Sequence, residues 1–356
     1  MPIFSYLLGH ALSLFAVIGF IYGGLWSYTL PLVTFGLVPL IELFTKPNTE
    51  NLSSDELKSR GQTSWFNYLT LAILPLQYAL LAFYLWQVAH ANWTLIEWVG
   101  CTLSMGILCG SYGINVAHEL GHRSDPLSRW AAKALLLSSL YMHFFIEHNR
   151  GHHAKVATEE DPASARLGES FYAFWCRSVK GGFISAWQLE ARRLERKSLS
   201  AWTWNNQALR FITIQAAFIM TLTILFGGFI ALSFIAVAVL GFSLLEAVNY
   251  IEHYGLQRQK NERGRYETVT PAHSWNADYP VSRMLLFELS RHSDHHAHPR
   301  RNYAQLRHFA ESYQLPTGYP GMIVLALFPF IYRPLMQKHI HSEAQRVNIH
   351  STVVIS

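Results

Sequence analysis

The chain has 356 residues, of which 51% are hydrophobic and 14% charged, whereas soluble domains carry about 25% charged residues. Eleven Trp, 17 Tyr and 22 Phe accompany a net charge of +5. This composition excludes a disordered protein and disfavours a globule exposed to water on all sides. The three cysteines form no Cys-x-x-Cys pair, which excludes a disulfide scaffold, a cysteine-based zinc site and a thiolate iron–sulfur module.

Three long blocks of the sequence are apolar. Residues 1–41 and 211–245 contain no Asp, Glu, Lys or Arg, and residues 61–117 contain only Glu97. A helix rises about 1.5 Å per residue and the hydrocarbon core is about 30 Å thick, so each block is long enough for two spans. We therefore expect three hairpins that turn near 23–28, 90–93 and 227–228. The six predicted transmembrane helices lie near 5–24, 27–45, 65–89, 94–117, 210–227 and 230–251.

The basic residues predict the orientation of these spans. All 28 Lys and Arg lie within 46–60, 123–210 and 258–346, and none lies in a hairpin turn. Short loops rich in Lys and Arg stay cytoplasmic, so we expect both termini and both large polar segments in the cytoplasm. The positive charge is then an orientation signal, and no basic–aromatic pattern indicates a nucleic-acid partner.

The predicted fold is an all-α integral membrane protein with a cytoplasmic, helical, His-rich catalytic cap. Residues 127–146 predict a further helix at the membrane surface, because Arg129 and Lys133 lie one turn apart and can both reach the headgroups. The expected organisation is 1–117 for four transmembrane helices with a cytoplasmic loop at 46–62, 118–209 for a cytoplasmic segment, 210–251 for the last two spans, and 252–356 for a C-terminal cytoplasmic segment.

Ten of the 18 histidines fall in four clusters, at 118–122, 147–153, 249–255 and 291–298, and nine of these ten form the candidate ligand set. Histidines at i, i+3 and i+4 share one helical face and can bind one metal, and an adjacent His-His pair can serve two neighbouring centres. Such polyimidazole sites suit Fe, Zn, Cu or Ni. One ion takes about four to six ligands, so the set predicts a dinuclear site. The predicted ligands are His118, His122, His148, His152, His153, His253, His292, His295 and His296.

Isolated histidines carry no such signal. We expect six of them to be structural or exposed: His10, His90, His308, His339, His341 and His350.

Two other classes of protein are alternatives. His118-Glu119-Leu-Gly-His122 matches the His-Glu-x-x-His signature of zinc proteases, in which Glu119 would be the general base. That interpretation leaves at least six aligned histidines without a role. A polyhistidine metal transporter would place ionisable residues within its spans, whereas these histidines lie at or beyond the cytoplasmic ends.

The spacing His-x3-His, His-x3-His-His and His-x2-His-His is similar to that of the membrane fatty-acid desaturase and hydroxylase superfamily. The resemblance is closer to the alkane 1-monooxygenase family, and it covers roughly 110–335. The segments that carry it are 147–153 with 156–158 and 161–164, 249–255, 291–298 and 315–321. The cluster around His253 separates this family and the xylene monooxygenases from most desaturases. Arg123 stands where the family often has Lys, which keeps the charge.

The resemblance implies a non-haem di-iron enzyme that hydroxylates the terminal methyl of medium-chain n-alkanes with O2 and two electrons. Zinc is redox-silent and cannot supply this chemistry. The implied partners are rubredoxin, an NAD(P)H-rubredoxin reductase and an alkane that arrives from the bilayer. The implied location is the bacterial cytoplasmic membrane. Another di-iron hydroxylase or a desaturase is the nearest alternative, because the product depends on how the substrate is placed.

Charged residues near the clusters have predicted roles. Four carboxylates, Glu119, Glu147, Glu252 and Asp294, are expected to accept the second ring N–H of the ligands and fix their tautomers. Asp161 and Arg291 are expected to form structural ion pairs. The basic patch Arg192, Arg193, Arg196 and Lys197 is expected either to dock an acidic electron donor or to anchor the chain to lipid.

Overall fold

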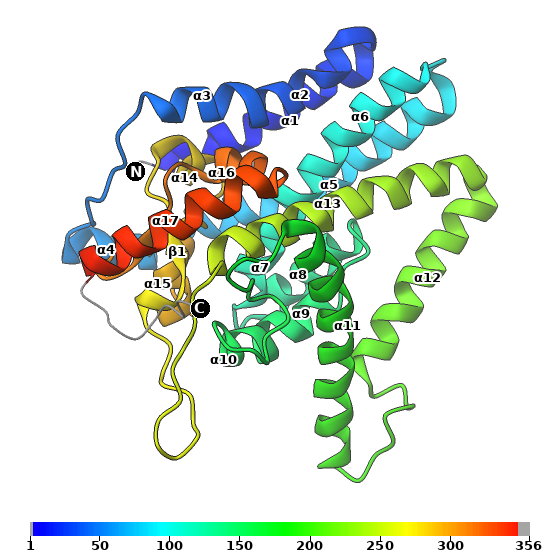
Figure 1. The fold of residues 1–356 in the computed structure, drawn as a ribbon. Coiled ribbons are helices and arrows are strands. Elements are labelled where there is room, and N and C mark those ends of the chain that lie inside the picture. Colours follow the sequence, from blue (N-terminus) through cyan, green and yellow to red (C-terminus); the bar gives the residue numbers. More distant parts are fainter. Residues whose placement is uncertain (1–2, 348–356) are drawn as a thin grey trace.

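Six helices of the computed structural model, which describes residues 3–347, are long and apolar enough to cross a membrane. They are Phe4–Tyr22, Gly24–Leu43, Trp65–His90, Leu95–Gly121, Gln207–Phe226 and Gly228–His253. The predicted number of spans and the all-α class are therefore confirmed. The spans form three hairpins whose tips lie at one end of the molecule, with the polar segments toward the other (Figure 1).

Several spans are built from more than one helical element. The first comprises η1 (Ile3–Tyr6) and α1 (Leu7–Tyr22), and the second η2 (Gly24–Tyr28), α2 (Thr29–Leu32), η3 (Val33–Leu37) and α3 (Val38–Leu43). The third is α5 (Trp65–His90), and the fourth comprises α6 (Leu95–Leu108), η4 (Cys109–Ile114) and α7 (Asn115–Gly121). The last two are α12 (Gln207–Phe226) and α13 (Gly228–His253).

Glu97 is the single charged side chain of its apolar block, and it forms hydrogen bonds at the starts of two neighbouring helices. Its backbone N–H and carboxylate complete a capping box with Thr94 at the start of α6. The other carboxylate oxygen accepts a hydrogen bond of 2.6 Å from the backbone N–H of Gly24, at the tip of the first hairpin. Glu97 therefore satisfies donors that a helix start leaves unpaired, and it joins two hairpin tips.

The fourth and sixth spans pack closely and run in the same direction, from the hairpin tips toward the polar end. A Cβ atom on Gly106 would lie 2.5 Å from Cβ of Leu240, and one on Gly110 would lie 3.0 Å from the carbonyl of Gly241. Larger residues at these glycines would push the two helices apart. Their close packing brings the C-terminal ends of α7 and α13 together.

The polar segments add shorter elements. Between the spans lie α4 (Ser54–Gln62), α8 (Pro126–Leu137), α9 (Phe144–Glu147), η5 (His148–His152), α10 (His153–Lys155) and α11 (Phe171–Glu195). After α13 come η6 (Pro271–His273), β1 (Trp275–Asn276), α14 (Pro280–Leu285), α15 (His292–Ala297), η7 (Tyr303–Gln305), β2 (Tyr313–Gln314), α16 (Tyr319–Ala326) and α17 (Pro329–Val347). The two strands pair in parallel.

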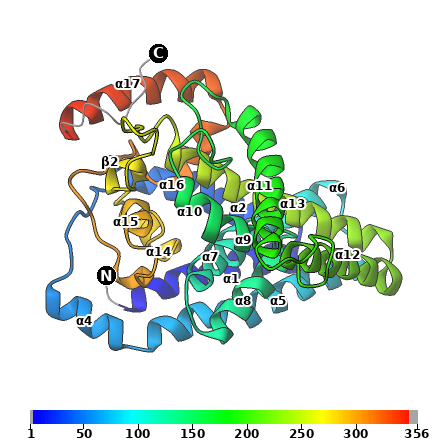
Figure 2. The same ribbon diagram turned by 90° about the horizontal axis from the view of Figure 1, so that it is seen from below.

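Of the helix predicted at 127–146, only the first part is present, as α8, which ends at Leu137, and Leu140 then has a positive φ of 50°. The cationic groups of Arg129 and Lys133 lie 5.1 and 5.2 Å from the centroid of the Phe145 ring. Seen from below, α4 and α17 lie on one side of the molecule and α12 lies on the opposite side (Figure 2). The division of the chain into four functional segments stays a prediction.

Candidate metal centre

Four elements bring the nine histidines of the predicted set together. The fourth span ends with His118 and His122, and α13 ends with His253. The segment η5–α10 supplies His148, His152 and His153, and α15 supplies His292, His295 and His296. Close packing of the spans thus gathers side chains that are up to 178 residues apart in the sequence.

The histidines divide into two groups in which each ring offers one nitrogen to the group. His118, His122, His148, His153 and His295 form the five-His cluster, and His152, His253, His292 and His296 form the four-His cluster. The offered atoms of each cluster lie within 4.8 Å of one another.

The distances within the clusters suit cations. In the five-His cluster, the Nε2 atoms of His122, His148 and His153 lie 3.0 to 3.2 Å apart in all three pairs. In the four-His cluster, Nε2 of His292 lies 2.9 Å from that of His296 and 3.3 Å from that of His253. Nitrogen lone pairs crowded in this way are stabilised by a shared cation.

A π-helical turn decides which histidines share a cluster. An α-helix places residues i and i+4 on one face, and this rule holds for His118 with His122 and for His292 with His296. The turn η5 is π-helical, with hydrogen bonds from i to i+5, so His148 shares its cluster with His153. His152 then points to the other cluster. The expectation that the doubled pair serves two centres agrees with this geometry.

Outside the membrane spans, burial favours the neutral form of six of these seven imidazoles by lowering their pKa, and His152 is the exception. Burial lowers the pKa of His122 to about 3 and holds the pKa of His148 and of His295 well below its usual value. Neutral imidazole is the form that binds metals. Nε2 of His118 is buried and has no hydrogen-bond partner among the described residues, as expected for a ligand nitrogen. The donor set therefore fits metal ions of the first transition series.

Asp161 orients one of the ligands, although the sequence indicated only a structural ion pair for it. Its Oδ2 lies 2.8 Å from Nδ1 of His152 and also accepts a hydrogen bond from Ser164. Burial lowers the pKa of His152, but the neighbouring Asp161 carboxylate outweighs burial and leaves that pKa raised. The carboxylate holds the proton on Nδ1, so that Nε2 is free to face the cluster.

The four carboxylates predicted to orient ligands lie in different surroundings. Glu119 pairs with Arg123 at 3.1 Å and accepts from the backbone of Tyr303. Asp294 binds His298 and Arg301. Oε1 of Glu147 lies 3.3 Å from the hydroxyl of Ser185.

Glu252, the fourth of these carboxylates, contacts a predicted ligand directly: its Oε2 lies 3.2 Å from Nε2 of His292. For Glu119, Asp294 and Glu147, the role of orienting a ligand stays a prediction.

Arg291 forms the structural ion pair expected of it. Its Nε donates to Asp278 at 2.9 Å, and its other nitrogens donate to the backbone carbonyls of Asn48 and Leu306. Because Arg291 directly precedes α15, these bonds fix the start of the helix that carries three of the histidines.

The isolated histidines lie apart from both clusters. Nδ1 of His308 lies 2.8 Å from Asp278, and His339 stacks on Trp275. His90 and His341 lie within 2.8 Å of backbone carbonyls of their own helices, and His10 contacts the ring of Phe287. His350 lies outside the described residues.

An apolar cavity ends at the metal centre. Its walls include Phe35, Ile107 and Leu244 of the membrane spans, together with Phe144, Leu286 and Ile323 of the segments outside them. At its polar end lie His118 and His148 of the five-His cluster and Glu252 and His292 beside the four-His cluster. An elongated apolar ligand in this cavity would place one end next to both clusters.

Residues 92–326 match the sequence model of the fatty acid desaturase family. The chain is 40% identical over 337 residues to alkane 1-monooxygenase 2 of Pseudomonas aeruginosa, covering 94% of this chain and 89% of that relative. It is 42% identical over 305 residues to the alkane 1-monooxygenase of Ectopseudomonas oleovorans, covering 86% and 76%. The chain belongs to the alkane 1-monooxygenase family. It is also 27% identical over 326 residues to the xylene/toluene monooxygenase hydroxylase component of Pseudomonas putida, covering 90% and 84%.

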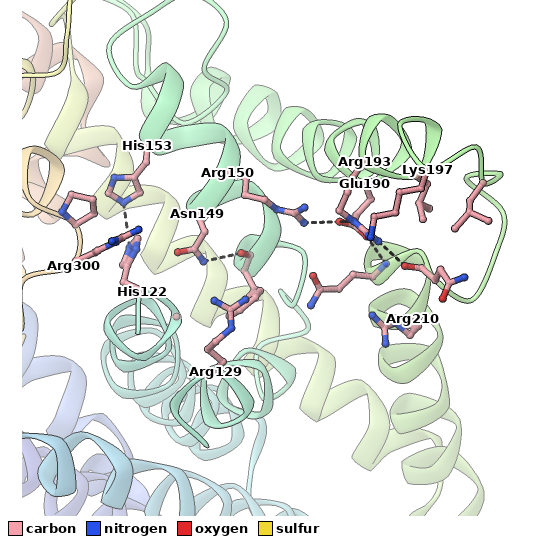
Figure 3. A pocket seen from close by; sticks show the side chains of 17 residues that line it. His122, Arg129, Asn149, Arg150, His153, Glu190, Arg193, Lys197, Arg210 and Arg300 are labelled. Carbon is pink, nitrogen blue, oxygen red and sulfur yellow. Dashed lines mark hydrogen bonds and ion pairs between the residues drawn. The ribbon is translucent and has the colours of Figure 1, made fainter. Parts of the chain in front are cut away.

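A basic cleft also borders the five-His cluster. His122 and His153 lie at one end of the cleft (Figure 3). Six cationic side chains line it: Arg129, Arg150, Arg193, Lys197, Arg210 and Arg300. Arg193 and Lys197 of the predicted basic patch are among them, whereas Arg192 and Arg196 are exposed outside the lining.

One acidic residue organises this cleft. Glu190 accepts from Arg150 at 2.7 Å, from Arg193 at 2.8 Å and from the backbone N–H of Gln207 at 2.7 Å. It therefore ties α11 to η5 and to the start of α12. This cleft could not be predicted from the sequence, because its six cations come from five separate segments that converge only through tertiary packing.

Proposed function

We propose that this member of the family hydroxylates the terminal methyl of medium-chain n-alkanes at a di-iron centre: an alkane, O2, two electrons and two protons give a 1-alkanol and water. One observation carries the proposal. Two clusters of largely buried histidines border an apolar cavity whose walls include residues of the membrane spans. The relatives named as alkane 1-monooxygenases support the choice of substrate.

The nine histidines are the proposed ligands of two irons. When bound, the irons supply the redox chemistry that activates O2 and attacks an unactivated C–H bond. Asp161 keeps His152 in the tautomer that presents Nε2. The apolar walls of the cavity bind the alkyl chain, exclude water and orient its terminal carbon toward His118, His148 and His292.

The proposed orientation places both termini and the metal centre in the cytoplasm, with the spans in the bacterial cytoplasmic membrane. Its support is the absence of Lys and Arg from the three hairpin turns. The substrate would enter from the bilayer, since an alkane has no polar group for an aqueous pocket. On this view 118–209 and 252–356 form the catalytic cap.

Rubredoxin, reduced by an NAD(P)H-rubredoxin reductase, is the proposed electron donor, and the basic cleft is its proposed docking surface. The cleft combines six cations with His122 and His153 of the five-His cluster, so an acidic donor seated there would approach the metal centre directly. The predicted patch of Arg192, Arg193, Arg196 and Lys197 contributes two of its four residues to this surface.

The zinc-protease alternative fits the geometry less well. A general base must reach a metal-bound water, but the Glu119 carboxylate points to Arg123 and to the backbone of Tyr303.

Metal analysis of the purified protein, together with product analysis from octane, tests the proposed function. We expect two irons per chain and, with O2 and reduced rubredoxin, 1-octanol that contains one oxygen atom from labelled O2. An alkene product would indicate a desaturase. Zinc in place of iron, with no oxidation product after iron reconstitution, would contradict the proposal.

A further inference from the structure

The Glu252 side chain is buried beside the four-His cluster. It is the residue before His253 at the end of α13, and only 1% of its surface is exposed. Oε1 accepts a hydrogen bond of 2.7 Å from the hydroxyl of Tyr319. Oε2 lies 3.2 Å from Nε2 of His292. Tyr319 thus holds one oxygen and leaves the other directed toward a predicted ligand.

The contact is made to the nitrogen of His292 that faces the cluster. Nε2 of His292 is also the atom that lies 2.9 Å from Nε2 of His296 and 3.3 Å from Nε2 of His253. A carboxylate that merely orients a ligand contacts the remote nitrogen, as Asp161 does with Nδ1 of His152. Glu252 therefore lies on the metal side of the ring, and the role predicted for it from the sequence does not describe its position.

The number of donors in each cluster and the charge of the Glu252 carboxylate also place this carboxylate next to a metal ion. One cluster has five imidazoles and the other has four, so the second ion has one donor fewer. A buried carboxylate is costly unless it is paired with a cation or coordinates a metal. The carboxylate of Glu252 contacts Tyr319 and His292, neither of which carries a fixed positive charge. A cation in the four-His cluster would supply that charge.

We propose that Glu252 is itself a ligand, which gives the ion of the four-His cluster a fifth donor and its only anionic one among the described residues. Glu252 also lines the apolar cavity together with His292. The carboxylate therefore lies on the side of that ion from which the alkyl chain approaches. This inference rests on the proposed metal centre, but it does not depend on which substrate is oxidised.

Cobalt binding to the metal-free protein in detergent tests the inference without measuring activity. Co2+ has visible absorption bands that report the number and type of its ligands. We expect the wild type to bind two Co2+ per chain with two distinguishable affinities. In Glu252→Gln, the ion of the five-His cluster should bind as in the wild type, whereas the affinity for the other ion should fall more than about 100-fold, beyond the loss from an orienting partner.

Two variants serve as controls. Glu246→Gln makes the same change in another buried glutamate of α13, whose Oε1 accepts from Tyr141. Tyr319→Phe removes the hydrogen bond to Glu252 but keeps the carboxylate. Both should bind two Co2+, and Tyr319→Phe should shift the bands of one ion. Unchanged helical circular dichroism and elution volume would show that Glu252→Gln is folded.

The outcomes separate this inference from the proposed function. If Glu252→Gln binds two Co2+ with wild-type affinities and unchanged bands, Glu252 is not a ligand, although the metal centre stands. Suppose instead that the wild type binds two ions and Glu252→Gln binds one, but the iron-loaded wild type does not hydroxylate octane. The proposed reaction is then wrong, while the assignment of Glu252 as a ligand stands. If the wild type binds no metal, both are wrong.

Discussion

Oδ2 of Asp161 lies 2.8 Å from Nδ1 of His152, and both side chains are buried. This contact joins residues nine positions apart, across the turn that follows α10. Asp161 also accepts from the hydroxyl of Ser164 and the backbone N–H of Ala163, so its own position is fixed. It is thus the residue best placed to set the tautomer of a ligand in the four-His cluster.

We expect Asp161→Asn to lower the affinity for one of the two metal ions by about 10–100-fold, because an uncharged amide stabilises the Nδ1 proton less well. Competition between the purified protein and a calibrated chelator would measure this affinity. Asp125→Asn, which alters a helix cap at Ser128, provides a control with the same chemical change. Equal metal affinity in Asp161→Asn and the control would show that the contact does not tune the centre.

His253→Ala should abolish hydroxylation and release the ion of the four-His cluster, while the protein still accumulates in the membrane. No other histidine of the four-His cluster can replace His253, because it is the only histidine that α13 supplies to that cluster. Iron content should fall from two ions to one per chain. His90→Ala, at a hairpin tip, should keep both ions and full activity. Full activity of His253→Ala would remove the fourth cluster from the metal centre.

The variant Glu119→Gln distinguishes the proposed hydroxylase from the alternative interpretation as a zinc protease. Since Glu119 pairs with Arg123, its loss should reduce the free energy of unfolding by roughly 1–3 kcal/mol and leave the metal content unchanged. Hydroxylation per folded molecule should stay close to that of the wild type. A general base would instead show intact metal and a complete loss of a peptidase activity, which is measured with a labelled unfolded substrate.

The sequence predicted the six spans because long apolar blocks have few alternative folds, and it predicted the histidine set because its spacing is helical. It could not assign His148 and His153 to one cluster, since the π-helical turn that aligns them has no simple sequence signature. Asp161 was missed as an orienting residue because its contact depends on a turn, not on helical periodicity. The pairing of Glu119 with Arg123 and with the backbone of Tyr303 could not be predicted in full either, because Tyr303 is distant in the sequence.

Glu190 should make the corner between α11 and α12 sensitive to acid. Burial alone would raise its pKa, but hydrogen bonds from Arg193, the Gln207 backbone and Arg150 lower the pKa to about 2. A lowered pKa stabilises the folded state above the usual value near 4.5, and this contribution is lost as the pH falls through about 2. We expect amides of 190–207 to exchange faster in Glu190→Gln than in the wild type at pH 7, with the difference shrinking below pH 4.5. A difference independent of pH would contradict this.

The docking of the electron donor can be tested by comparing two basic surfaces, the basic cleft and the exposed pair Arg192 and Arg196. Arg129, Arg210 and Arg300 are exposed and line the basic cleft, whereas Arg192 and Arg196 are exposed outside it. If the donor docks in the cleft, reversing the charges of Arg129, Arg210 and Arg300 should raise the KM for the protein donor about tenfold or more. Reversing Arg192 and Arg196 should change it far less.

Salt dependence provides an independent measurement of the same docking. Exposed charges are screened beyond about 8–10 Å at physiological ionic strength, so the wild-type rate with the protein donor should fall as salt is added. The cleft variant should lose most of this slope, whereas a small chemical reductant should support the same rate in every variant. If reversing Arg192 and Arg196 abolishes the slope and the cleft variant keeps it, the donor docks on the outer face of α11, as the sequence alone suggested. If both variants keep the wild-type KM and slope, electrons enter by another surface and the cleft has a different role.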